Sequence, residues 1–290
     1  MVYKYLLLLL LLPLLNACVK NNPDPSWLVV NEWSLEANPT LNGEEGQLTH
    51  NITDAWVYVD NQLIGVFEVP FKIPILHHGL SKIRLYPTIR VNGISATKMR
   101  NEHLEPFEIE GLLVQNEILE VWPTTHYKSD VNFWVEDFED ININLNDDPN
   151  TSSAHLILAN DSLQWFNGNY YGKVILDSQD SIWVSYTNQD AQLSIPKNKQ
   201  AMLELDYCNS VPFTHYLLFV NSNGITENPM ITMNKNALNA LRWKKIYILL
   251  NEVITAGPNN SNYVQAFRSF YDANIANNLI LIDNIKVVYF

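Results

Sequence analysis

Apolar and polar residues alternate with a period of two along much of the chain, which is the pattern of β-strands with one buried face. The stretch 55–59 reads Ala-Trp-Val-Tyr-Val, and in 81–87 two basic residues alternate with Ile83 and Leu85. Asn-Gly pairs favour tight turns because both residues accept a positive φ. Such turns are predicted at Asn42-Gly43, Asn92-Gly93, Asn167-Gly168 and Asn223-Gly224. No long stretch follows the helical period, so the sequence predicts an all-β protein.

The predicted strands fall into two groups that meet near residue 128. Residues 27–128 predict a small N-terminal β-sandwich, and residues 129–290 predict a larger C-terminal β-sandwich. The abundance of Val, Ile, Tyr, Trp and Phe suits strands, and the abundance of Asn suits the turns between them. The chain is long enough for two domains of ordinary size.

The beginning of the chain has the features of a secretory signal. Lys4 is followed by an apolar run from Leu6 to Leu15, which is too short to span a bilayer as a helix. The motif Leu15-Asn16-Ala17-Cys18 resembles the lipobox of bacterial lipoproteins. This resemblance implies that residues 1–17 are a signal peptide, that Cys18 carries a lipid such as palmitate, and that residues 18–26 are a lipidated spacer. An ordinary cleaved signal and an uncleaved membrane helix are the alternatives.

The residues after Cys18 bear on the expected location. Residue 19 is Val rather than Asp, which by analogy with enterobacterial sorting favours the outer membrane. The chain thus resembles an outer-membrane lipoprotein of the Bacteroidota type, and the periplasmic and cell-surface faces both stay open.

The charge of the chain excludes one class of partner. It has 31 acidic and 18 basic residues and a net charge of −13, so it will not bind nucleic acid by releasing counterions. The same charge repels anionic lipid, so the lipid on Cys18 is the expected membrane contact. Cys208, the other cysteine, lies in a strand pattern and is predicted to be a buried apolar residue.

The stretch from Ala55 to Pro87 resembles the PEGA-type domain. The shared features are a strand, the Asp60-Asn61 turn, Gly65, a proline-containing strand and the strand 82–85. The resemblance implies a small β-sandwich that serves as a spacer near a wall or surface and carries no catalytic residues. The spacing from Gly65 to the next proline is longer here than in many members.

The C-terminal part resembles jelly-roll domains of the galactose-binding-like and carbohydrate-binding-module class. The motifs are short and are found at Phe138-Glu139-Asp140, in the strand after Gly172, at Trp243-Lys244-Lys245-Ile246 and at Ile282-Asp283-Asn284-Ile285. The resemblance implies a jelly-roll β-sandwich and, less directly, a carbohydrate ligand.

Many modules of this class hold a structural calcium ion between the first and last strands. Carried over by position, the resemblance implies that Asp283 and either Glu139 or Asp140 bind calcium. Calcium takes six to eight oxygen ligands, and carboxylates at the two ends of the domain could supply several of them. A hydrogen-bonded turn and a solvated acidic stretch explain the same residues without a metal.

A glycan site needs aromatic rings that stack on sugars and amides that bond their hydroxyl groups. The densest such cluster lies in a loop-like stretch beside a predicted turn, where binding residues are common. Its members are Trp165, Phe166, Asn167, Asn169, Tyr170 and Tyr171. The alternative is that these rings cap the core. Trp183 and Trp243 fall within strand patterns and are predicted to lie in the core.

The sequence contains none of the common catalytic motifs, among them Gly-x-Ser-x-Gly, Cys-x-x-Cys and His-Glu-x-x-His, and it therefore predicts no enzyme. Two functions remain. The first is a membrane-anchored lipoprotein that displays a β-sandwich module for a glycan or surface polymer. The second is a structural or interaction subunit that contacts a protein of an outer-membrane assembly or secretion complex.

Overall fold

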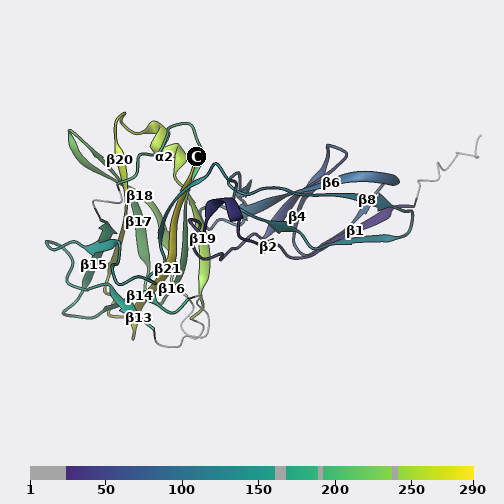
Figure 1. Cartoon of the computed structure of the whole chain (residues 1–290). Helices are drawn as coiled ribbons and strands as arrows, with labels where there is room; N and C mark the ends of the chain where they lie inside the picture. Colours follow the sequence, from purple (N-terminus) through teal and green to yellow (C-terminus); the bar gives the residue numbers. More distant parts are fainter. Residues whose placement is uncertain (1–23, 161–167, 189–191, 237–240) are drawn as a thin grey trace, which may run out of the picture.

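The computed structural model describes residues 24–160, 168–188, 192–236 and 241–290. These residues form two β-sandwiches, and the N-terminal one projects from the side of the C-terminal one (Figure 1). The all-β prediction is confirmed, as is the order of a small sandwich followed by a larger jelly roll. None of the helices in this part of the chain is long and apolar enough to cross a membrane.

The N-terminal sandwich consists of two main layers and a two-stranded connection. One layer has the order β5-β1-β9, with bounds Phe71–Ile75, Ser26–Val30 and Ile118–Val121. The other has the order β4-β3-β6-β7, and β8 also pairs with β6; the bounds are Gln62–Glu68, Asp54–Val59, Gly79–Arg90, Lys98–Arg100 and Phe107–Leu113. β2 (Ser34–Leu35) pairs with β10 (Thr124–Thr125).

The predicted turn between β3 and β4 is present and has a clear physical cause. Asp60 and Asn61 adopt φ values of 48° and 66°, and positive φ at both central residues matches the twist of the two strands that they join. The hairpin brings Ala55 opposite Phe67 and so sets the register of the layer. The sequence pattern therefore identified this unit correctly.

The C-terminal sandwich is a jelly roll of two antiparallel sheets. The inner sheet, next to the N-terminal sandwich, has the order β13-β14-β21-β16-β19, with bounds Ile157–Ala159, Tyr171–Leu176, Asn278–Tyr289, Ala201–Asn209 and Lys244–Leu249. β11 (Asn132–Glu136) also pairs with β21. The outer sheet has the order β12-β15-β20-β17-β18, with bounds Leu145–Asp147, Ile182–Thr187, Asn262–Phe270, Phe213–Asn221 and Gly224–Met233. A short helix, α2 (Asn251–Ala256), follows β19.

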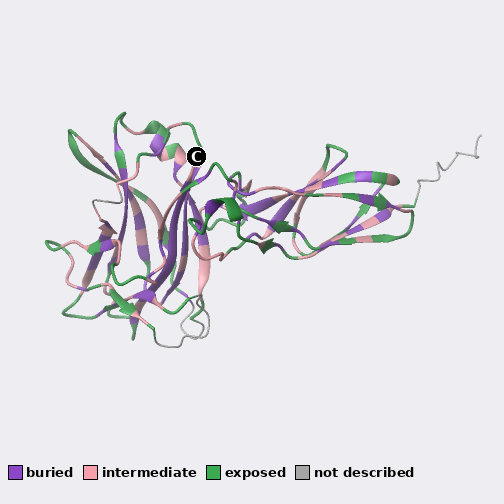
Figure 2. Ribbon diagram, in the orientation of Figure 1, coloured by how far each residue is buried: buried purple, intermediate pink, exposed green. Residues whose placement is uncertain are grey.

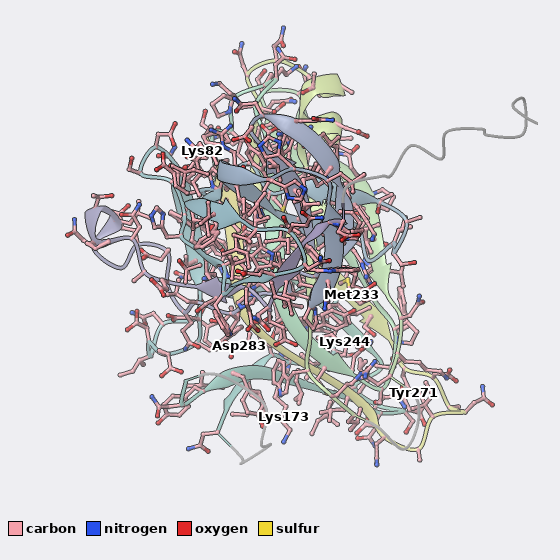
Figure 3. The ribbon with its side chains drawn as sticks, turned by 90° about the vertical axis from the view of Figure 1, so that its right-hand side faces the viewer. Lys82, Lys173, Met233, Lys244, Tyr271 and Asp283 are labelled. Carbon is pink, nitrogen blue, oxygen red and sulfur yellow. The ribbon has the colours of Figure 1, made fainter. Side chains whose placement is uncertain are left out.

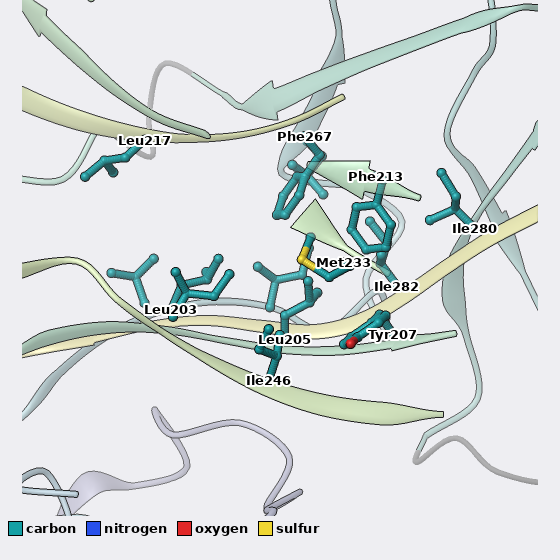
Figure 4. Packing of buried hydrophobic residues seen from close by; sticks show 14 of the residues in the cluster. Leu203, Leu205, Tyr207, Phe213, Leu217, Met233, Ile246, Phe267, Ile280 and Ile282 are labelled. Carbon is teal, nitrogen blue, oxygen red and sulfur yellow. The ribbon is translucent and has the colours of Figure 1, made fainter. Parts of the chain in front are cut away.

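The core of the jelly roll lies between these two sheets. Leu203 and Leu205 of the inner sheet and Phe213 and Phe267 of the outer sheet belong to one buried cluster (Figure 4). Trp183 is fully buried and stacks on Phe267 with an interplanar angle of 6°, which confirms it as a core residue. Cys208 is buried as predicted, and burial raises the pKa of its thiol.

Part of the inner sheet is buried on both faces, because the second face of β16, β19 and β21 packs on the N-terminal sandwich. Met202, Tyr247 and Val288 of β16, β19 and β21 belong to the same buried cluster as the N-terminal core. Figure 2 shows that the middle layer of the molecule is almost continuously buried. The two sandwiches therefore share an apolar interface. The domain boundary predicted at residues 128 and 129 lies between β10 and β11.

Charged side chains are buried within this interface. Glu204 of β16 has 1% of its surface exposed, and its carboxylate accepts a hydrogen bond from the Tyr127 hydroxyl, with both oxygens 3.0 Å from the hydroxyl oxygen. The Lys245 ammonium lies 3.4 Å from Glu204, and the Lys286 ammonium donates to the backbone carbonyl of Gln47. Residues of both sandwiches thus complete one buried polar network.

Candidate functional site

The outer face of the outer sheet forms an open groove with a volume of about 520 Å³. It lies on the far side of the jelly roll from the N-terminal sandwich, on the sheet that contains β15, β17, β18 and β20 (Figure 1). Side chains from all these strands line it. The members on which the site depends are Tyr186, Tyr216, Arg268, Glu227, Asp148 and Asn150.

The period of two in these strands explains which side chains enter the groove. In β17, Phe213, His215 and Leu217 are buried, whereas Tyr216 lies between two of them and is only partly buried. In β15, Trp183 is buried in the core, and Tyr186 has the opposite orientation. The two tyrosines consequently face the groove.

The register of the strands aligns the two tyrosines. Tyr186 is opposite Ala266, and Ala266 is opposite Tyr216 on its other side. Because neighbouring strands lie roughly 4.8 Å apart, the two tyrosine positions are separated by about 10 Å. The small side chain of Ala266 leaves the space between the rings open, and Val184 and Val264 complete an apolar floor.

A charged pair lies beside the tyrosines. The Arg268 guanidinium is 4.9 Å from the centre of the Tyr216 ring and donates to Glu227 at 3.2 and 3.4 Å. The guanidinium stacks on the Tyr216 ring and also donates to the Glu227 carboxylate, and these two contacts orient both side chains. The groove thus offers rigid donors and acceptors next to an aromatic surface.

Polar residues also border the groove. Asp148 accepts hydrogen bonds from the backbone N–H of Asn150 and from the Thr151 hydroxyl, at 2.9 and 2.8 Å. These bonds lower the pKa of Asp148, so it is an ionised acceptor at neutral pH. Gln192 also lines the groove and accepts a hydrogen bond of 3.4 Å from Asn262. Rings for stacking, together with amides and charges for hydroxyl groups, are the chemistry that a sugar chain requires.

The predicted aromatic cluster has a different position. Trp165, Phe166 and Asn167 lie outside the described residues. Tyr171 is fully buried, and its ring packs edge-on against Trp243 with ring centres 5.7 Å apart. A buried ring cannot stack on a sugar, so the prediction for Tyr171 is corrected: it is a core residue.

The two remaining members of the predicted cluster have structural contacts. Tyr170 is partly buried and packs against the core of the jelly roll. Asn169 donates to the Glu139 carboxylate from its backbone N–H and from its side-chain amide, at 2.6 and 2.9 Å. The described part of this loop is therefore held to the preceding acidic segment.

Sequence reasoning missed Tyr186 and Tyr216. Both lie in stretches whose composition suits strands, 181–186 and 213–220, but a strand pattern shows only that two faces alternate and does not show which face another layer covers. The sequence did carry a signal, because residues an odd number of positions apart in a strand point to opposite faces. Tyr216 is an odd number of positions from Phe213 and Leu217, and Tyr186 is an odd number of positions from Trp183.

The three predicted calcium ligands are not equivalent in the structure. Glu139 accepts the two hydrogen bonds from Asn169 and a third from the backbone N–H of Tyr170. Partial burial tends to raise the pKa of Glu139, but these bonds outweigh it, and the pKa is below its ordinary value. Asp140 is exposed. Among the described residues, no three His, Cys, Asp or Glu side chains form a group that could hold a metal ion.

Asp283 is the residue that fits a cation. It is 1% exposed, its Oδ1 accepts the Asn284 backbone N–H at 2.7 Å, and its Oδ2 has no hydrogen-bond partner. Burial, reinforced by the charges of Asp206, Asp137 and Glu139, raises its pKa to about 9. The buried oxygens Asn284 Oδ1 and Gln47 Oε1 are also without partners. Amide and carboxylate oxygens of this kind are calcium ligands, so the chemistry of these donors fits the ion.

Comparison with known proteins gave only distant similarities. The sequence matches no protein-family model, and no curated protein matches it. Among solved structures, it is similar to a xylan-binding domain of carbohydrate-binding module family 22, at 13% identity over 53% of this chain and 92% of that chain, with a TM-score of 0.35.

Two further structures are similar to a comparable extent. One is the second family 22 xylan-binding domain of Paenibacillus barcinonensis Xyn10C, at 13% identity over 54% of this chain and 99% of that chain, with a TM-score of 0.37. The other is a family 11 carbohydrate-binding module of Clostridium thermocellum in complex with a mixed-linked tetrasaccharide, at 13% identity over 53% of this chain and 94% of that chain, with a TM-score of 0.36. At these identities and TM-scores, the similarity does not assign a ligand to this chain.

Proposed function

We propose that this chain is a non-catalytic lipoprotein of the outer membrane that binds a glycan in the groove of its outer sheet. The observation that carries the proposal is the row Tyr186, Ala266 and Tyr216, in which two partly buried rings flank a small residue on an open face. Flat sugar rings stack on such side chains, and Arg268 and Glu227 bond the hydroxyl groups around them.

The arrangement of the two sandwiches supports display of the groove. The inner sheet packs on the N-terminal sandwich, so the outer sheet is turned away from it. β1, the first strand after the proposed tether, belongs to the N-terminal sandwich (Figure 1). In this account the N-terminal sandwich is a spacer between the lipid and the binding face.

A screen of the soluble chain against immobilised glycans tests this function. A secreted form in which Cys18 is replaced by serine, and which therefore lacks the proposed lipid, is expected to bind a subset of polysaccharides. If this form binds no glycan, and the wild-type protein copurifies from membranes with a protein complex, the chain is an interaction subunit and the proposal is wrong.

The proposed lipid anchor gives a second expected result. Cells that express the protein and grow with a radiolabelled fatty acid should label the wild type and Cys208→Ala, but not Cys18→Ala. The two variants are matched because the chain has only two cysteines. One of them, Cys208, is buried in the jelly roll. Label retained in Cys18→Ala would contradict the anchor.

We also propose that calcium binds at Asp283 and stabilises the jelly roll, with Asn284 and Gln47 as further oxygen donors. A ligand that binds only the folded state raises stability by RT ln(1 + [L]/Kd), which is about 2.7 kcal/mol at 100 times Kd. We expect calcium to raise the Tm of the wild type and EDTA to reverse the rise. Asp283→Asn should lose this response, and Asp177→Asn, the same change at an exposed turn, should keep it. Equal Tm values with calcium and with EDTA in the wild type would exclude the site.

A further inference from the structure

A second cleft lies at the junction of the two sandwiches and has a volume of about 540 Å³. The N-terminal sandwich contributes Arg90, at the end of β6, and the C-terminal sandwich contributes the segment 242–246 before and within β19. The cleft is on the inner sheet and is therefore separate from the groove, which occupies the outer sheet.

The lining of this cleft is basic, although the protein as a whole is acidic. Arg90, Arg242, Lys244 and Lys245 line it, and no Asp or Glu is found among its described lining residues. The chain has only 18 basic residues against 31 acidic ones, so a cleft lined by four basic residues has a charge opposite to that of the protein as a whole. A concave surface of one charge attracts ligands of the opposite charge.

Two of the four cations are already neutralised. Lys245 lies 3.4 Å from Glu204 and 3.6 Å from Asp206. Arg90 lies 2.9 Å from Glu68 and 3.4 Å from Asp54. These ion pairs hold the two side chains in place.

The other two cations have no carboxylate partner within ion-pair distance among the described residues. Lys244 is labelled in Figure 3. It donates to the backbone carbonyl of Asn234 at 3.3 Å and lies 5.0 Å from the centre of the Tyr207 ring. Burial lowers the pKa of Lys244, and the charge of Arg242 lowers it further. Two neighbouring cations in a partly buried cleft repel each other, and an anion between them would remove that cost.

We infer that the junction cleft binds an oxyanion, meaning a carboxylate, sulfate or phosphate group, between Arg242 and Lys244. Arginine binds two oxygens of such a group through paired N–H donors, and lysine adds a point charge. Trp243 and Tyr207 provide an apolar wall beside the cations, which suits an anionic group that is carried on a sugar ring. The inference does not depend on glycan binding in the groove.

Titration of the soluble full-length chain with three anions tests this site. Sodium sulfate, sodium phosphate and sodium D-glucuronate are each titrated by calorimetry, at an ionic strength held constant with sodium chloride. At least one of them should bind saturably, with a stoichiometry of one. Tighter binding of glucuronate would identify an acidic polysaccharide as the source of the anion, and tighter binding of sulfate or phosphate would identify a free ion.

Three variants complete the test. Arg242→Gln, which changes an exposed side chain, and the double variant Arg242→Gln/Lys244→Gln should each bind at least about tenfold more weakly, because charge-assisted hydrogen bonds are lost. Lys82→Gln removes the same charge from the N-terminal sandwich and should bind as the wild type does. Tyr216→Ala, in the groove, should also leave anion binding unchanged. No saturable binding of any anion to the wild type, or wild-type affinity in the folded Arg242→Gln variant, would overturn the inference.

Discussion

Replacement of Tyr216 by alanine is expected to weaken glycan binding by roughly thirtyfold, which corresponds to about 2 kcal/mol for loss of a central aromatic contact. Tyr216 lies on β17, opposite Ala266 of β20 on one side and Pro229 of the edge strand β18 on the other, and its ring also contacts Arg268. The substitution therefore removes a stacking surface and frees the guanidinium at once. Calorimetric titration with a glycan from the screen measures the change.

Two further variants distinguish the loss of ring stacking from a non-specific effect of replacing a tyrosine. Tyr216→Phe should keep most of the affinity, because stacking needs the ring and not the hydroxyl group. Tyr58→Ala removes a partly buried strand tyrosine of the N-terminal sandwich and should leave the affinity unchanged. If Tyr216→Ala and Tyr58→Ala had equal affinities, the groove would not be the binding site.

Replacement of Glu204 by alanine is expected to destabilise the protein by about 3–5 kcal/mol, because it breaks a buried ion pair and removes the acceptor of the buried Tyr127 hydroxyl. Glu204 is the carboxylate that Tyr127 and Lys245 share at the interface of the two sandwiches. Its loss would leave the Lys245 ammonium, whose side chain is 4% exposed, with Asp206 at 3.6 Å as its remaining carboxylate. Denaturation in urea, with the free energy of unfolding extrapolated to water, measures the effect.

Glu110→Ala is the matched control for this experiment. Glu110 is exposed on β8 opposite Lys82, and such surface charges contribute less than about 1 kcal/mol. A free energy of unfolding for Glu204→Ala within 1 kcal/mol of the Glu110→Ala value would show that water or a rearranged partner satisfies Lys245. In that case the buried network would not stabilise the junction.

Local features were predictable from the sequence because their causes are local. The Asp60-Asn61 turn follows from two residues that tolerate positive φ, and the strands around it follow from the alternation of apolar and polar residues. Trp183 and Cys208 were recognised as core residues for the same reason, since each lies on the apolar phase of a strand.

The candidate site was less predictable because it depends on how the layers are stacked. The outer face of the outer sheet is open, whereas the second face of β16, β19 and β21 is covered, and this difference arises only when the N-terminal sandwich packs on the inner sheet. Tyr171 and Tyr216 both lie in strands, β14 and β17, yet the first is buried and the second lines the groove. Likewise, the partners of Glu139 could not be known before its hydrogen bonds to Asn169 and Tyr170 were seen.

The measurement that tests the central claim most directly is a crystal structure of the soluble chain with an oligosaccharide from the glycan screen. The account predicts that the sugar chain lies along the outer sheet, with rings stacked on Tyr186 and Tyr216 and with hydroxyl groups bonded to Arg268 or Glu227. An oligosaccharide that binds at the loop of Asn169 and Tyr170, with the groove empty, would contradict it.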